Sequence, residues 1–89
     1  MINREIKIIN KLGLHARAAA KFVTMASQYS SNVQLELKGQ QINGKSIMGV
    51  MMLAASQGTE LTLTTEGEDE SSAMEALDEL IKNRFGEEE

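Results

Sequence analysis

Residues 32–43 read "NVQLELKGQQIN", and this stretch predicts a β-hairpin. Val33, Leu35 and Leu37 alternate with polar residues, which is the period-two pattern of a strand with one buried face. Gly39 permits a tight turn into a short second strand. Because strands joined by so short a turn run antiparallel, the hairpin favours an antiparallel sheet.

Two further segments show the same alternation. In "REIKII" (residues 4–9), Ile6 and Ile8 alternate with charged residues. In "TELTLTTE" (residues 59–66), leucine alternates with β-branched threonine. Both segments predict strands, which brings the expected sheet to four strands.

Three other stretches have the apolar spacing of amphipathic helices. The first begins at Ala16 and ends near the polar run "SQYSSN". The second covers "IMGVMMLAAS" (residues 47–56), for which Ser46 is a good N-cap. The third covers residues 68–85, with acids in its first turn and bases in its last, before a "GEEE" end that is expected to be frayed. The order is βαββαβα, which predicts an α+β fold with three helices on one face of a four-stranded, largely antiparallel sheet.

Length and composition limit the function. The 89 residues suffice for one domain, residues 1–89, and are too few for a cofactor domain beside a substrate domain, so no cofactor is expected. The chain contains no cysteine, which excludes disulfides and thiolate metal sites. No run approaches the roughly 18 apolar residues of a membrane span, so we expect a soluble cytoplasmic domain.

Charge is unevenly placed along the chain. Residues 1–45 carry seven Lys and Arg and two Glu, a net charge of +5, whereas residues 46–89 carry −9. A basic half suits an anionic group or an acidic protein surface. Nucleic acid is the weaker interpretation, because one Tyr and two Phe leave little for bases to stack on.

Residues 39–46, "GQQINGKS", match the phosphate-loop pattern G-x-x-x-x-G-K-[ST]. A functional phosphate loop wraps free backbone N–H groups around a nucleotide, within a parallel sheet that supplies an acidic residue for Mg²⁺. Here Ile42 and its neighbours are predicted to form a hairpin strand, and no predicted strand ends in a metal-binding Asp. Nucleotide hydrolysis is therefore disfavoured, and Ser46 is interpreted as a helix cap.

His15 is the only histidine and lies in "NKLGLHARAAAKF" (residues 10–22). The simplest interpretation is a turn residue or N-cap. Three features favour chemistry instead: Gly13 allows a close approach of the chain, the helix N-terminus favours anions and a neutral imidazole, and Arg17 offers a guanidinium fork for phosphate oxygens. One histidine cannot fill the coordination shell of a metal ion without Cys and without a carboxylate at ligand spacing nearby. The residues that flank His15 also show no partner that could orient the ring for general acid–base catalysis. The residues thus predict covalent capture of an anionic group, with phosphoryl the natural candidate.

No charged residue occurs between Ser46 and Thr59, so this segment has more apolar surface than one core-facing stripe buries. Val50, Leu53 and Ala54 are expected to face the sheet. The side chains then expected to point outward are Ile47, Met48, Met51 and Met52. Methionine adapts to differently shaped partners, which suits a docking surface. Periodicity leaves open the alternative that these residues belong to the core.

The stretches "GLHARAAAKFV" and "GKSIMGVMML", at their separation, resemble the histidine-containing phosphocarrier protein (HPr) family of the bacterial phosphoenolpyruvate-dependent phosphotransferase system. The resemblance covers essentially the whole chain and implies that family's open-faced β-sandwich. It implies that enzyme I phosphorylates His15 on Nδ1, that Arg17 binds the phosphate, and that a IIA-type protein receives it. Ser46 matches a regulatory serine that HPr kinase phosphorylates in some bacteria. The residues expected to contact partners are Ala16, Ala20, Ile47, Met48, Met51 and Met52.

Ala18 stands where the family commonly has proline, in "HARPAA". Proline in a first helical turn removes no intrahelical hydrogen bond, so its loss costs at most ~0.4–1 kcal/mol. Ala18, the "NKLG" lead-in and the "RFGEEE" ending resemble the nitrogen-related branch (NPr), so sugar uptake and nitrogen-related regulation both stay open. A different class also stays open, a non-catalytic regulatory module with Ser46 as its switch. We expect a monomeric carrier rather than an enzyme, without metal, nucleic acid or membrane insertion.

Overall fold

The computed structural model describes residues 1–88. Its elements, in chain order, are β1 (Ile2–Lys7), α1 (Ala16–Ala26), β2 (Asn32–Leu37), β3 (Gln40–Asn43), α2 (Ile47–Met52), β4 (Glu60–Glu66), α3 (Glu70–Lys82) and the 3₁₀ turn η1 (Arg84–Gly86). This order confirms the predicted βαββαβα arrangement. No helix among the described residues combines the length and the apolar character needed to cross a membrane.

The four strands form one sheet in the order β1-β4-β2-β3, and each neighbouring pair is antiparallel. The predicted hairpin is the β2–β3 pair, in which Leu35 lies opposite Ile42. Residues 40–43 of the phosphate-loop match form β3, and the Oγ of Ser46 accepts the N–H of Gly49 at 3.1 Å as the N-cap of α2. The match is therefore a strand and a cap, as predicted, and not a phosphate loop.

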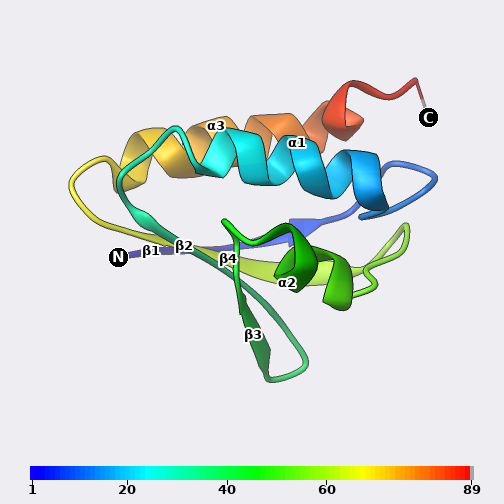
Figure 1. Ribbon diagram of the computed structural model, residues 1–89, viewed down its shortest axis with the longest axis horizontal. Coiled ribbons are helices and arrows are strands. Elements are labelled where there is room, and N and C mark those ends of the chain that lie inside the picture. The colour runs from blue at the N-terminus through cyan, green and yellow to red at the C-terminus, as the bar shows by residue number, and fades with distance from the viewer. Residues whose placement is uncertain (89) are drawn as a thin grey trace.

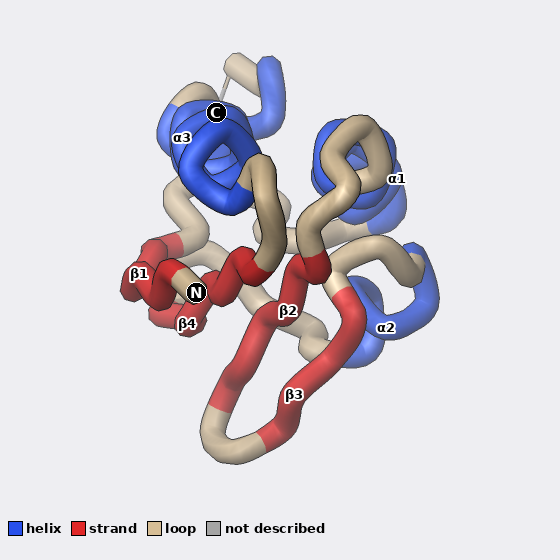
Figure 2. The backbone as a smooth tube through the Cα atoms, turned by 90° about the vertical axis from the view of Figure 1, so that its left-hand side faces the viewer, coloured by secondary structure: helices blue, strands red, loops and turns tan. Residues whose placement is uncertain are grey.

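Helices α1 and α3 lie together on one side of the twisted sheet (Figure 1). Helices α1 and α3 run side by side above the strands, and α2 packs beside α1 and β3 (Figure 2). Between the layers, the fully buried side chains include Phe22 of α1, Leu35 of β2, Leu63 of β4 and Leu77 of α3. Removal of this apolar surface from water is the main force that holds the helices on the sheet. The predicted α+β layering is confirmed.

The boundaries of β1 and α3 differ by a few residues from the prediction. Strand β1 starts and ends two residues earlier than predicted, because its pairing with β4 begins with Ile2 opposite Thr65. Helix α3 is shorter than the predicted helix over residues 68–85. Its shortening has a local cause, since Arg84 and Phe85 adopt left-handed φ angles of 56° and 55°, which no α-helix can continue through.

Helix α2 also ends earlier than the predicted segment over residues 47–56. The chain leaves the helix after Met52, and Ala54 has a left-handed φ of 51°. As a result Ala54 is exposed, so the prediction that it faces the sheet is wrong. Ala55 is buried instead, with only 4% of its surface exposed.

Asp69 links the start of α3 to the loop that follows α1. Its carboxylate accepts the backbone N–H groups of Ser30 and Ser31, each at 2.9 Å, and also the hydroxyl of Ser31. The hydroxyl bond from Ser31 is the largest cause that lowers the pKa of Asp69 from 3.8 to about 2. A carboxyl whose pKa is lower in the folded than in the unfolded state stabilises the fold above its unfolded pKa, and this contribution is lost as pH falls toward the folded value.

We expect Asp69→Asn to lower the free energy of unfolding at neutral pH, because one amide oxygen cannot serve the three donors of the carboxylate. The difference in the free energy of unfolding between the variant and the wild type should narrow between about pH 4 and about pH 2, because Asp69 of the wild type becomes protonated there. Urea denaturation at several pH values measures this change. Glu68→Gln, which removes the same charge from an exposed side chain, is the control. A deficit that stays constant across this acid range would contradict the prediction.

Candidate functional site

His15 is the N-cap of α1, with the extended backbone angles φ −73° and ψ 177°. The first intrahelical hydrogen bond runs from the N–H of Ala19 to the C=O of His15, at 2.8 Å. The N–H groups of Ala16, Arg17 and Ala18 therefore precede the helical ladder and point toward the start of the helix. A helix start of this kind attracts anions through these N–H groups and the helix dipole.

The loop before His15 is pinned against the segment that follows α2. The N–H of Leu14 donates to the C=O of Ala55 at 2.8 Å, and the Nδ2 of Asn10 donates to the C=O of Gly13 at 2.8 Å. Gly13 has a φ of +70°, and a Cβ at this position would lie 2.4 Å from the carbonyl oxygen of Ala55. The predicted close approach at Gly13 is therefore confirmed, and it fixes the position from which His15 projects.

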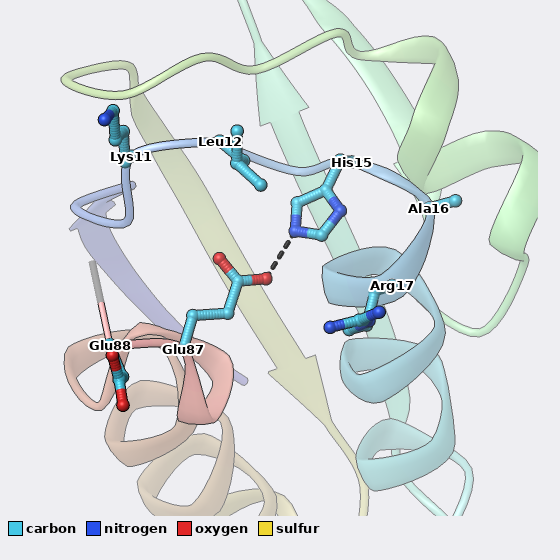
Figure 3. A pocket seen from close by; sticks show the side chains of 7 residues that line it. All are labelled: Lys11, Leu12, His15, Ala16, Arg17, Glu87 and Glu88. Atoms are coloured by element: carbon cyan, nitrogen blue, oxygen red, sulfur yellow. Dashed lines mark hydrogen bonds and ion pairs between the residues drawn. The ribbon is translucent and has the colours of Figure 1, made fainter.

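An open cavity of ≈760 Å³ surrounds the histidine (Figure 3). Its lining residues are Lys11, Leu12, His15, Ala16, Arg17, Glu87 and Glu88. The structure thus brings together three predicted site residues, His15, Ala16 and Arg17, and Arg17 is exposed in the first turn of α1. In Figure 3 one ring nitrogen of His15 faces Glu87, while the other faces the start of α1. An anion bound there would meet a ring nitrogen, a guanidinium and a helix start together.

Glu87 is the main component of the site that sequence reasoning missed. Its Oε2 contacts the Nε2 of His15, and its Oε1 accepts the Nδ2 of Asn10 at 3.0 Å. Burial acts to raise the pKa of Glu87, but the hydrogen bonds from Asn10 and His15, with the nearby charge of Lys21, lower it overall. Glu87 is therefore an ionised carboxylate at neutral pH, placed directly beside the imidazole.

The prediction of a frayed end is wrong for Gly86 and Glu87, because Gly86 ends an ordered turn and Glu87 is held in the site. Glu89, which the same prediction included, lies outside the described residues. Local spacing could not reveal this carboxylate, because Glu87 lies 72 positions from His15 in the sequence. Asn10 carried no signal in the sequence either, because its role depends on burial and on contacts with the tail.

The apolar patch of α2, defined as Ile47, Met48, Met51 and Met52, is exposed as predicted. The exposed fractions of these side chains are 44%, 76%, 42% and 66% in that order. Val50 and Leu53, on the other side of the segment, are buried at 0% and 5% exposure, also as predicted. Ala20 is half-buried and lines a shallow groove along α1 together with Arg17. Leu12, 67% exposed beside His15, adds apolar surface that the sequence reasoning did not single out.

Comparison with known proteins gives consistent matches. The family model described as "PTS HPr component phosphorylation site" matches residues 2–83. The phosphocarrier protein HPr of Xylella fastidiosa (strain Temecula1) is 56% identical over 87 residues, 98% of each chain, and that of Pseudomonas aeruginosa is 61% identical over 84 residues, 93% of each chain. The crystal structure of HPr-C-His from Thermoanaerobacter tengcongensis is 49% identical, has a TM-score of 0.96 and is covered completely, as is this chain. A crystal structure of an HPr dimer from the same organism has a TM-score of 0.79 at 49% identity, with 98% of this chain and 100% of that chain covered.

The open sheet beneath three helices and the extent of these matches define a phosphocarrier protein, which carries a phosphoryl group rather than turning over a substrate. The chain belongs to the HPr family of the phosphotransferase system. The predicted family, its fold and its carrier function are therefore confirmed.

Proposed function

We propose that His15 accepts the phosphoryl group on Nδ1 from phosphorylated enzyme I and passes it to a IIA-type protein in the cytoplasm. The observation that carries this proposal is the position of the imidazole at the start of α1, where three backbone N–H groups precede the helical ladder. The side chain is 28% exposed, so a partner's active site can reach the ring. A carrier needs this accessibility, because both its donor and its acceptor are other proteins.

Arg17 and the helix start receive the phosphate oxygens in this proposal. The guanidinium can bind two of these oxygens, and the first-turn N–H groups can donate to the third. The helix end contributes only ~0.3–1 kcal/mol at an exposed position. Weak binding suits a carrier, because a tightly held phosphate could not be passed on.

The apolar patch of α2, together with Ala16 and Ala20, serves as the docking surface for enzyme I and the IIA-type protein. Support comes from the exposure of four large apolar side chains on a short helix that packs against α1, the helix that His15 caps. Exposed methionines repack against surfaces of different shape, which one patch needs if it is to serve two partners. The protein would act as a monomer, which leaves the patch free.

The proposal is tested by incubating the protein with phosphoenolpyruvate and enzyme I, followed by peptide mapping of the phosphate. We expect one phosphate for each chain, on the peptide that contains His15, with the acid lability and base stability of a phosphoramidate. A phosphate that is stable in acid, or that maps to any other peptide, would refute the assignment of His15.

Ser46 is proposed as a second, regulatory modification site for HPr kinase. Its Oγ is half-buried and caps α2 by accepting the N–H of Gly49, so a phosphate there would place charge beside the apolar patch. Incubation with HPr kinase and ATP, followed by mass spectrometry, tests this role. We expect one acid-stable phosphate that Ser46→Ala removes, and an unmodified wild-type protein would leave Ser46 as a helix cap only.

A further inference from the structure

The C-terminal segment is built to hold one carboxylate against the histidine. Phe85 is fully buried, and its C=O accepts the Nζ of Lys21 from α1 at 2.8 Å. The next two N–H groups donate back to the preceding turn at 3.0 and 2.9 Å. Asn10, which is completely buried, then donates to the Oε1 of Glu87 at 3.0 Å. Glu87 is thus placed by a buried aromatic anchor and by hydrogen bonds from two other segments.

The second carboxylate oxygen, Oε2, contacts the Nε2 of His15. Both side chains are part-buried, with exposed fractions of 28% for His15 and 15% for Glu87. In a neutral imidazole one ring nitrogen carries the proton and the other carries the lone pair. A carboxylate beside Nε2 selects the form with the proton on Nε2, which leaves the lone pair on Nδ1. Figure 3 shows this second nitrogen turned toward the start of α1.

We propose that Glu87 is a positioning residue for phosphoryl transfer, a role that rests on the proposed function of His15. Glu87 orients the ring, holds the proton on Nε2 and stabilises the charge that the ring gains. As the lone pair of Nδ1 forms the N–P bond, the bond between phosphorus and the donor breaks, and its electron pair stays with the donor. No proton leaves His15, so the phosphorylated ring is an imidazolium whose Nε2–H faces the carboxylate.

The contact between Glu87 and His15 is also present when the phosphoryl group leaves His15 for its acceptor. When the phosphoryl group moves on, the electron pair of the N–P bond returns to Nδ1 and the ring becomes neutral again. Glu87 therefore lowers the barrier to accepting phosphate and also favours the phosphorylated state at equilibrium. Arg17 and the helix start act on the phosphate oxygens, whereas Glu87 acts on the opposite side of the ring.

Glu87→Ala in the full-length protein tests the proposal, with Glu79→Ala as the matched control. Glu79 carries the same charge, is exposed, and lies on α3 outside the cavity beside His15. Loss of one charge-assisted hydrogen bond at a part-exposed site should slow phosphoryl acceptance from enzyme I roughly tenfold in kcat, with KM for enzyme I unchanged. Proton NMR should show a protected Nε2–H resonance of His15 in the wild type and the control, and its loss in Glu87→Ala.

A second variant keeps the test decisive if Glu87→Ala loosens the tail. Glu87→Gln keeps the length of the side chain but offers one acceptor oxygen instead of two, so we expect an intermediate rate. Wild-type rates and an unchanged Nε2–H resonance in both variants would overturn the inference. That result is distinguishable from failure of the proposed function, in which the wild-type protein itself would carry no phosphate on His15.

Discussion

His15→Ala is expected to abolish phosphoryl acceptance while the fold is retained. This histidine is the only one in the chain, so its removal leaves no imidazole to act as the acceptor. Hydroxyl groups are poor substitutes, because they need a nearby base for activation. With phosphoenolpyruvate and enzyme I, labelling should fall at least roughly a thousandfold, to the limit of detection.

The stability of His15→Ala should stay close to that of the wild type. The imidazole is part-exposed, and its one side-chain hydrogen bond in the described structure is the part-buried contact with Glu87. A change in the free energy of unfolding of about 0.5 kcal/mol, or about 2–4 °C in Tm, is expected for such a position. Thermal melting therefore separates a lost acceptor from a lost fold.

Arg17→Ala is the matched variant for this experiment, because it changes the same helical turn and leaves the acceptor atom in place. It should still reach one phosphate for each chain, but more slowly. Labelling of His15→Ala at the wild-type level would show that the phosphate resides elsewhere, and the assignment of His15 would then be wrong.

The parts of the fold that could be predicted are those with a strong local pattern. Alternation in "NVQLELK" places Val33 and Leu35 in the core, and the glycine after it marks the turn of the hairpin. The N-cap role of Ser46 is equally local, because a hydroxyl three residues before a free N–H needs no tertiary contact. His15 and Arg17 share one turn, so their proximity also follows from sequence.

The parts that could not be predicted depend on tertiary packing. Glu87 reaches His15 only because Phe85, in a left-handed conformation, is buried and turns the chain back toward the N-terminus of α1. An acidic "GEEE" end shows no periodicity, so its composition alone favours fraying. Helical spacing predicts Ala54 on the core face, but its positive φ breaks that spacing. For Glu87, contacts between distant segments override the local pattern.

Gly13→Ala is expected to lower the free energy of unfolding by about 2–5 kcal/mol. A left-handed φ of +70° costs an alanine roughly 1–2 kcal/mol. The new Cβ would also lie 2.4 Å from the carbonyl oxygen of Ala55 and 2.8 Å from the Cα of Ser56, so the backbone must move. Overpacking of this kind adds roughly 1–3 kcal/mol. Urea denaturation of the variant and the wild type measures the loss.

Gly39→Ala separates the two contributions. Gly39 has a similar φ of +83°, but a Cβ there would meet nothing within 4 Å, so only the conformational cost of roughly 1–2 kcal/mol applies. The additional loss in Gly13→Ala then measures the close approach of the loop to Ala55. Because this loop carries His15, Gly13→Ala should also slow phosphoryl acceptance, whereas Gly39→Ala should not. Equal losses of stability in the two variants, with equal rates of acceptance, would show that the loop tolerates displacement and that the approach to Ala55 does not fix the histidine.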